Sequence, residues 1–148
     1  MKKHIALLLL ILVTATSVFA QKTGPYKITG IRIMPFDEVE GKFRDTLAPD
    51  DIGGWGNDLS MSILAVIELT GAAGSYGDKR TVSIRVMEGR KLKVSKIGYP
   101  GVFSDSGHYY VPVWINGSVC DNLTITATML GQTTKSSMTR KLSAHCGE

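Results

Sequence analysis

The sequence predicts an all-β domain, folded as a two-sheet antiparallel sandwich of about seven strands with an immunoglobulin-like or related topology. Three observations predict this fold class. Apolar and polar residues alternate with a period of two in several segments, those segments are rich in β-branched residues, and turns containing glycine, proline or asparagine separate them. Each such strand buries one face, and two packed sheets cover those faces. A jelly roll or a small barrel is the alternative.

Residues 1–20 have the parts of a secretory signal peptide. Lys2 and Lys3 form a basic start, an apolar run follows, and small residues precede Gln21. The apolar run is too short to span a membrane. We therefore expect residues 21–148 to form a single domain with no membrane span, located in the bacterial periplasm or secreted.

The charge of the exported domain is small but unevenly distributed. The formal net charge of +4 falls to +2 (4 − 2 = 2) without Lys2 and Lys3, so it does not indicate nucleic-acid binding. Acidic residues are concentrated between positions 36 and 58 and basic residues between positions 79 and 96. We expect these two clusters to steer a partner of opposite charge if they lie apart, and to neutralise each other if they meet.

The N-terminal part of the domain predicts one strand followed by a long loop. Residues 25–35 alternate as a strand whose apolar parity changes at Gly30, which predicts a β-bulge there. Residues 36–57 show no sustained period and predict an acidic loop, in which Trp55 stands among glycines. We interpret Trp55 either as a plug over the edge of the core or as an anchor for a partner.

Residues 59–70 predict a central, well-buried strand. They are apolar at every second position, and Leu64 and Val66 on the other parity are apolar too. A helix is the competing interpretation, but the flanking glycines and the strict alternation favour a strand. A glycine-rich loop with Tyr76 follows.

Residues 82–94 predict a hairpin with one solvated face. A turn centred on Gly89 would pair Val86 with Leu92 on the buried face. The exposed face would then carry three basic side chains: Arg85, Lys91 and Lys93.

The C-terminal part predicts a three-stranded meander. Residues 109–115 and 123–130 alternate as strands, and Asn116-Gly117 between them is a favoured hairpin dipeptide because it supplies two residues with positive φ. A turn at residues 131–135 leads to a last strand that ends at Cys146.

The only two cysteines, Cys120 and Cys146, are predicted to form a disulfide. A hairpin centred near residue 133 opposes residues whose numbers sum to about 266, and 120 + 146 = 266. Such a bridge would contribute about 3–4 kcal/mol. However, the apolar faces of the two strands match only if the numbers of opposed residues have an odd sum. We therefore expect either a β-bulge or a position for Cys120 just outside the ladder.

No residue set predicts catalysis, a metal site or a cofactor. The mature chain has two histidines, His108 and His145, which are too few for a histidine-rich metal site. Acidic residues in the 36–58 segment could offer oxygen ligands to calcium, but their spacing does not match a calcium loop. Residues 104–108 contain serine, aspartate and histidine, yet triad members come from distant segments, so we interpret this stretch as a polar turn.

The tetrapeptide Ser106-Gly-His-Tyr109 reads Ser-Gly-x-Tyr on a loop that enters a strand. It resembles the short motif of bacterial periplasmic inhibitors of invertebrate-type and goose-type lysozymes, which are small secreted β-sandwich proteins. The resemblance implies that Ser106 and Tyr109 would enter the cleft of a lysozyme.

These patterns together favour a non-enzymatic binding protein that engages a protein partner through loops at one end of the sandwich. The loops at 36–58, 71–78 and 98–108 carry the candidate partner-binding residues Ser106, Tyr109, Trp55 and Tyr76, with Tyr99 and Phe103 beside them. The alternatives are a periplasmic lysozyme inhibitor and a structural or adhesive surface subunit. A hydrolase that uses His108 with Asp105 is a further class.

Overall fold

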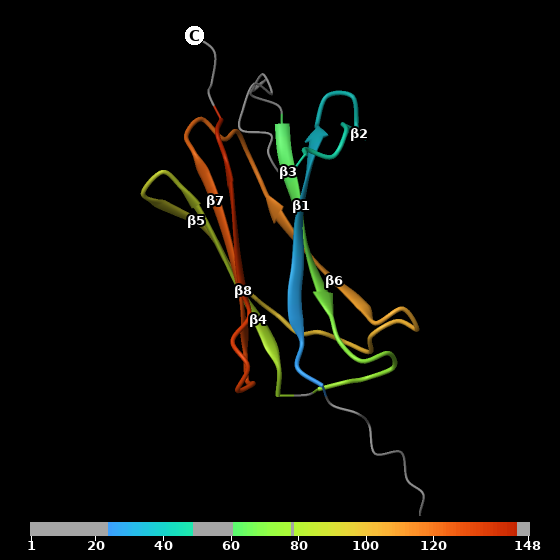
Figure 1. Ribbon diagram of the computed structural model, residues 1–148. Helices are drawn as coiled ribbons and strands as arrows, with labels where there is room; N and C mark the ends of the chain where they lie inside the picture. Colours follow the sequence, from blue (N-terminus) through green and yellow to red (C-terminus); the bar gives the residue numbers. More distant parts are fainter. Residues whose placement is uncertain (1–23, 49–60, 78, 145–148) are drawn as a thin grey trace, which may run out of the picture.

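The computed structural model describes residues 24–48, 61–77 and 79–144, and they form two antiparallel sheets packed face to face (Figure 1). One sheet has the strand order β2-β1-β3-β6 and the other β5-β4-β7-β8. No helix occurs in these residues. The predicted two-sheet sandwich is confirmed, with eight strands rather than seven because the short β2 was not foreseen. The bounds are β1 (Lys27–Asp37), β2 (Lys42–Phe43), β3 (Met61–Thr70), β4 (Thr81–Glu88), β5 (Lys91–Gly98), β6 (His108–Ile115), β7 (Leu123–Leu130) and β8 (Ser137–Leu142).

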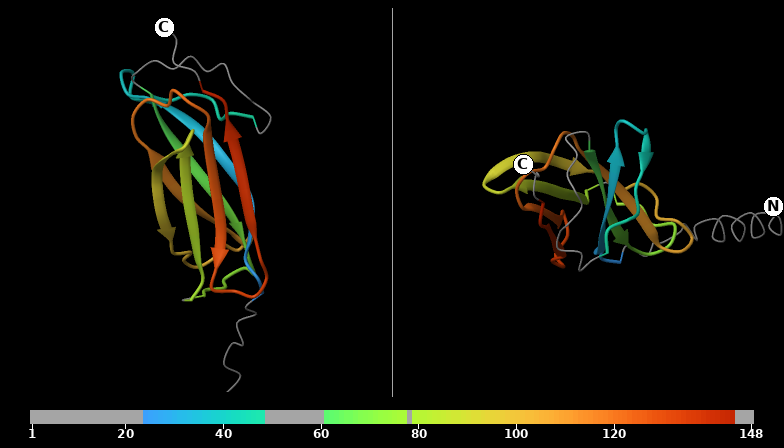
Figure 2. Two further views of the ribbon diagram at one scale, coloured as in Figure 1. Left: turned by 90° about the vertical axis from the view of Figure 1, so that its left-hand side faces the viewer. Right: turned by 90° about the horizontal axis from the view of Figure 1, so that it is seen from above.

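The core lies between the sheets and is made by alternate residues of the long strands. In β3, Ile63, Ile67 and Leu69 are fully buried, and in the other sheet Ile84 and Ile125 meet them from the opposite side. Each such side chain contributes about 1.5–3 kcal/mol by leaving water. The left view of Figure 2 shows the β5-β4-β7-β8 sheet in front of the other sheet, whose strands run at an angle behind it.

The predicted bulge at Gly30 is confirmed. The pairing of β1 with β3 passes from Ile28 opposite Leu69 to Gly30 opposite Glu68, which leaves Thr29 as the extra residue. The extra residue explains why the buried positions change parity along β1. Residues 59 and 60, which the sequence placed at the start of the next strand, lie outside the described residues.

The predicted meander of residues 109–146 is wrong in its first half. β6 pairs with β3, whereas β7 pairs with β4 in the other sheet, so residues 116–122 cross from one sheet to the other. Gly117 has a φ of 75°, but Asn116 does not have a positive φ, and a tight hairpin of the expected type needs both. Val119 is fully buried, which anchors the crossing segment in the core.

The second half of that prediction, the hairpin of β7 and β8, is confirmed. Leu123 lies opposite Leu142, so that paired residue numbers sum to 265 (123 + 142 = 265), the odd sum that matched apolar faces require. Cys120 precedes β7 and therefore lies outside the ladder, which is one of the two arrangements we expected. Cys146 lies outside the described residues, so its bridge to Cys120 stays a prediction.

The hairpin of β4 and β5 exists, but its predicted register is wrong. Val86 pairs with Val94 rather than with Leu92, because Glu88 and Lys91 close a two-residue turn and Lys93 is then the extra residue of a bulge. Leu92 consequently faces outward beside Met87 and is 47% exposed. Of the three basic residues expected on the solvated face, Arg85 and Lys91 are exposed, whereas Lys93 is drawn inward.

Candidate binding surfaces

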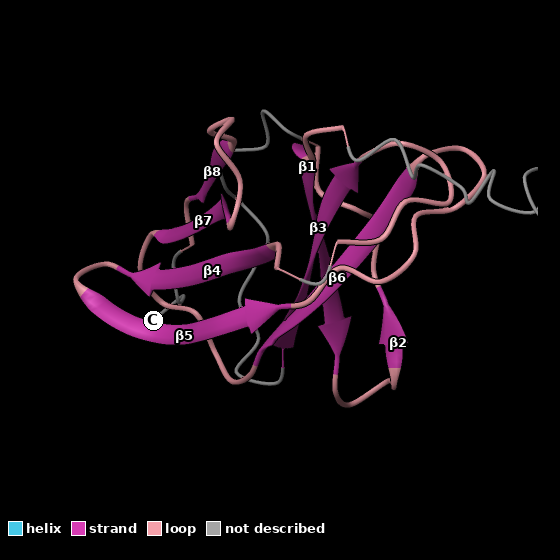
Figure 3. Ribbon diagram, turned by 90° about the horizontal axis from the view of Figure 1, so that it is seen from below, coloured by secondary structure: helices cyan, strands magenta, loops and turns pink. Residues whose placement is uncertain are grey.

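Two loops, residues 71–77 and 99–107, lie side by side at the same end of the sandwich, and we call them the loop end (Figure 3). Three backbone hydrogen bonds join them: Gly71 N donates to Gly107 O at 2.9 Å, Gly74 N to Phe103 O at 3.0 Å, and Phe103 N to Ser75 O at 3.1 Å. Each loop thereby satisfies backbone groups of the other, and their relative position is fixed.

Phe103 holds the loop end against the core. Its side chain is 1% exposed, and its ring lies 4.4 Å from the ring of Tyr26 and 5.9 Å from that of Tyr109, measured between centroids. The sequence suggested Phe103 as an accessible loop aromatic, and that interpretation is wrong. Where a loop packs over the hydrophobic core, its apolar side chains are buried in the same way as those of a strand.

The Ser106–Tyr109 motif lies on a tight turn of the loop end. Gly107 N donates to Ser104 O at 2.8 Å, and Ser104 N donates to His108 O at 3.0 Å. Gly107 has a φ of 74°, and a side chain there would lie 2.6 Å from Gly71 O, so only glycine fits. Ser106 is exposed at the tip, whereas Tyr109 is half-buried against Phe103.

Exposed aromatic and apolar side chains gather at the loop end. Tyr99 is 72% exposed, Val102 64% and Tyr76 48%. A groove of about 290 Å³ between β5 and β6 continues this surface, and Tyr99, Tyr109 and Tyr110 form its aromatic lining. Tyr76, Ser106 and Tyr109, which the sequence proposed, thus lie at one end of the molecule.

The acidic segment does not belong to that end. β1 and β3 are antiparallel neighbours, so the connection between them leaves the sheet at the end opposite the β3–β4 loop. Its described part, residues 38–48, includes β2 and lies toward the top of Figure 1, and the loop end lies at the bottom. The expectation that all three loops share one end is therefore wrong for this part. Trp55 lies outside the described residues.

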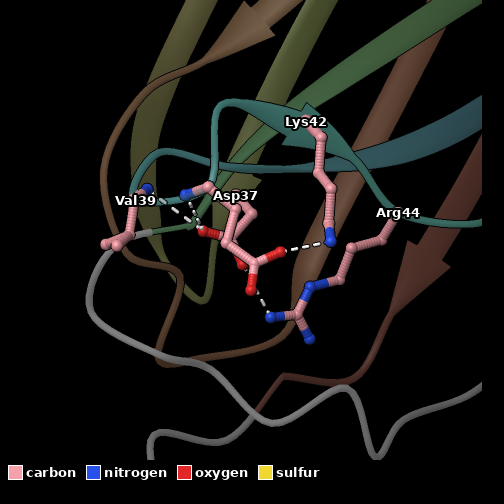
Figure 4. A network of polar contacts seen from close by, with 5 residues as sticks. Asp37, Val39, Lys42 and Arg44 are labelled. Carbon is pink, nitrogen blue, oxygen red and sulfur yellow. Dashed lines mark hydrogen bonds and ion pairs between the residues drawn. The ribbon is translucent and has the colours of Figure 1, made fainter.

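Asp37 organises the turn between β1 and β2 (Figure 4). Its carboxylate accepts hydrogen bonds from the backbone N–H groups of Val39 at 3.1 Å and Glu40 at 3.0 Å, and from Arg44 at 2.8 Å. The Arg44 guanidinium and these amides hold the pKa of Asp37 below its ordinary value. Glu40 forms an ion pair with Lys42 beside it.

Charged side chains of the β4–β5 hairpin also form their contacts close to the hairpin itself. Lys93 Nζ donates to Glu88 at 2.9 Å and to Ser118 O at 2.7 Å, and Glu88 also accepts from Cys120 N at 2.8 Å. Burial alone would raise the pKa of Glu88, but the hydrogen bonds from Lys93 and Cys120 lower it overall. Both charge clusters are thus partly neutralised within themselves, and these contacts fix the turn between β1 and β2 and the crossing segment between β6 and β7.

The described residues do not assemble a triad around His108. Its ring stacks on Tyr110 with centroids 6.2 Å apart, and its Nδ1 is buried without a hydrogen-bond partner in the described part of the chain. The hydroxyl of Ser104 accepts from the backbone N–H of His108 and lies 2.9 Å from that of Ser106. In residues 24–48, 61–77 and 79–144 no three histidine, cysteine or acidic side chains form a group that would hold a metal ion.

The outer face of the β2-β1-β3-β6 sheet is a second candidate surface, which sequence reasoning missed. We call it the aromatic face; it consists of Met34, Phe36, Phe43, Leu64, Val66, Tyr110 and Trp114. Leu64 and Val66 carried the signal, because they made β3 apolar on both parities. We interpreted that signal as complete burial, yet both side chains are only half-buried.

Comparison with models of known protein families finds no match, and a search of curated proteins finds no similar sequence either. Within the described residues, no helix is long and apolar enough to span a membrane. The signal peptide proposed for residues 1–20 lies outside those residues.

Proposed function

We propose that this chain is a non-enzymatic binding protein, exported to the periplasm or secreted, that holds a protein partner on its loop end. The observation that carries the proposal is the exposure of Tyr76, Tyr99 and Val102 on two loops whose backbones are hydrogen-bonded to each other. Binding costs less conformational entropy when the contact residues are already held in place.

The chemistry of the loop end suits a protein partner. Tyrosine offers a large apolar ring and a hydroxyl while losing little rotamer freedom, and it is enriched in protein interfaces. The groove beside β5 adds Tyr110 and a lysine, Lys96, to the same surface. A partner would thus meet a central aromatic patch with a polar rim.

A lysozyme is the more specific candidate partner. The supporting observation is that Ser106 projects from a turn held by backbone hydrogen bonds and by the contact of Gly107 with Gly71. A protruding, rigid turn is the shape that enters an enzyme cleft. Tyr109 supports this turn from its half-buried position.

A subunit that polymerises by strand donation is disfavoured by the strand edges. Around the start of β1, backbone groups are already satisfied by side chains of the β7–β8 turn: Gln132 exchanges two hydrogen bonds with the backbone of Tyr26, and Ser136 Oγ accepts from Ile28 N. At the β6 edge, Pro112 lacks an N–H, and its carbonyl accepts from Lys96 at 2.8 Å. These edges offer few free groups to a donated strand.

The proposal is tested by binding of the mature protein to purified lysozymes of the invertebrate and goose types and to proteins captured from relevant secretions. We expect Tyr76→Ala with Tyr99→Ala to weaken binding at least tenfold, because interface tyrosines are frequent hot spots. Leu92→Ala is the matched control, since Leu92 is similarly exposed but lies at the opposite end. Each captured partner is rebound as a pure protein before it is counted.

The outcomes separate the hypotheses. Inhibition of a lysozyme that is lost in Ser106→Ala but kept in Leu92→Ala supports the inhibitor. A partner lost in the tyrosine variant alone supports the broader binding function. Retention of every partner in the loop-end variants, with loss only in Leu92→Ala, contradicts the proposal.

A further inference from the structure

The aromatic face exposes more apolar surface than solubility alone would favour. Phe43, Tyr110 and Trp114 are 47%, 46% and 45% exposed, and they surround half-buried Leu64 and Val66. An aromatic side chain has about 150–250 Å² of surface, so these three leave about 300 Å² in water. With the half-buried members, the apolar area reaches about 500 Å², the upper range for a monomer.

The side chains of this face are also held in place. The ring of Phe36 lies 5.0 Å from that of Phe43 and 5.8 Å from that of Trp114, and the rings of Phe43 and Trp114 are 5.9 Å apart. Met34 and Leu64 extend the cluster, because Met34, Leu64 and Trp114 are direct neighbours across β1, β3 and β6. The result is a fixed surface rather than a set of mobile side chains.

Its composition is that of a protein interface core. Tryptophan, tyrosine, phenylalanine, methionine and arginine are enriched in such cores. Arg32 pairs with Glu68 at 2.5 Å and lies over the ring of Tyr110 at 5.1 Å, whereas Lys27, opposite Thr70, lies at the start of β1. Arg32 and Glu68 neutralise each other, and Lys27 lies at the opposite end of β1 from the rings of Phe36 and Phe43, so little charge repulsion opposes a second face of the same kind.

The outer face of the other sheet has a different composition. Serines and threonines surround Arg85 and Lys141 there, and the exposed apolar residues Leu92, Ile97 and Leu130 lie on its edge strand and at a strand end; no carboxylate lies among these outward residues in the described part of the chain. Two copies of that face would bring like charges together. Of the two sheet faces, the aromatic one combines clustered rings with a paired charge, which makes it the better surface for self-association.

We propose that the aromatic face is the contact of a two-fold symmetric dimer, in which it packs on the same face of a second copy of this chain. Two such faces bury about 1,000 Å² in total, which reaches the lower limit for a specific interface. Sheets pack face to face readily, and the contact becomes an additional apolar layer. This contact lies on the outer face of the sheet, whereas the loop end lies at the end of the strands, and Tyr110 borders both surfaces.

The test is sedimentation velocity of the mature chain across concentrations from about 1 μM to about 500 μM. We expect a concentration-dependent monomer–dimer equilibrium. Trp114→Arg and, separately, Leu64→Lys should each leave a monomer at every concentration, because a buried unpaired charge would face its own copy. Leu92→Arg on the other sheet and Tyr99→Arg on the loop end are matched controls that should still dimerise.

Fluorescence gives a second readout that does not depend on these charge variants. With Trp55→Phe, Trp114 is the only tryptophan left, since the chain has two. Its emission should shift to the red on dilution as the dimer dissociates. Thermal melts confirm that each variant is folded.

Two results overturn the proposal. The first is a monomer of the unchanged sequence up to about 500 μM, with constant Trp114 emission. The second is a dimer that persists in folded Trp114→Arg and Leu64→Lys but is lost in either control. The first result would mean that the aromatic face does not contact a second copy of this chain. The second would mean that the dimer forms through another surface.

Discussion

The two outer sheet faces of this sandwich are built on the same backbone pattern but differ in the residues at their centres. On β3, the outward positions between buried residues are Leu64, Val66 and Glu68; on β7, they are Thr124, Thr126 and Thr128. The threonines continue across the sheet, where the hydroxyl of Thr126 lies 3.1 Å from that of Thr139 and the hydroxyl of Thr128 lies 2.9 Å from that of Ser137. We call this second surface the hydroxyl face.

The difference separates what determines the fold from what is left for function. Both sheets fill their inner faces with aliphatic residues because the core requires it. The outer faces are not constrained in that way, and polar residues such as those of the hydroxyl face are the ordinary solution. Rings clustered on one outer face therefore need a reason other than folding.

The largest expected effect distinguishes inner from outer positions of one strand. Ile67→Ala leaves a cavity in the core and should lower the free energy of unfolding by about 2–5 kcal/mol. Val66→Ala, one residue away on the aromatic face, should cost about 1 kcal/mol or less. Denaturant titration of both variants measures the free energy of unfolding. Equal decreases in the two variants would show that the aromatic face is buried in solution more fully than in the structure.

The ion pair that anchors the crossing segment should have the next largest effect. Lys93→Met removes the ammonium that binds both Glu88 and Ser118 O, and we expect a loss of about 1–3 kcal/mol because the acceptors remain partly buried. Lys91→Met is the control, since Lys91 is exposed. If the two variants melt at the same temperature, Lys93 does not hold the crossing segment.

Exchanging chemistry between the faces should change solubility more than stability. Thr126→Val makes the hydroxyl face more apolar, and we expect its stability to stay within about 0.5 kcal/mol of the original. Trp114→Ser should reduce the binding of a hydrophobic dye, whereas Thr126→Ser should leave dye binding unchanged. Dye binding that is insensitive to Trp114 would contradict the exposure of the aromatic face.

The smallest effect concerns pH at the turn beside the aromatic face. The pKa of Asp37 is lower in the folded chain than in the unfolded chain, so its contribution to stability is complete above the unfolded pKa of about 4 and is lost as pH falls through the folded value. Melting curves between pH 2 and pH 6 should therefore converge for the original and Asp37→Asn at the acidic end. A difference in melting temperature between the two proteins that stays constant with pH would contradict this role of the Asp37 carboxylate.

The sequence predicted those parts of the fold that depend on local pattern. The bulge at Gly30 and the odd register of the β7–β8 hairpin follow from where apolar residues alternate, and alternation is readable without a structure. Alternation did not predict which strands pair when the partner strand is distant in the sequence. Asn116-Gly117 reads as a hairpin turn until β6 is seen to pair with β3 instead of β7.

The candidate surfaces were predictable to a similar extent. Tyr76 and Ser106 were found because polar and aromatic residues stand out in loops between strands. Phe103 was misjudged because nothing local shows that a loop folds back over Tyr26. The aromatic face was missed because a strand that is apolar on both parities looks the same whether its second face is covered or open.

The most direct test of the difference between the two faces is a methyl NMR spectrum of the mature chain recorded at low and at high concentration. Both faces carry methyl groups, so one experiment reports on both. We predict that the methyl signals of Met34, Leu64 and Val66 shift with concentration while those of Thr124, Thr126 and Thr128 stay in place. Equal shifts on both faces, or shifts confined to the threonines, would contradict the assignment of the aromatic face as the surface that meets a second copy.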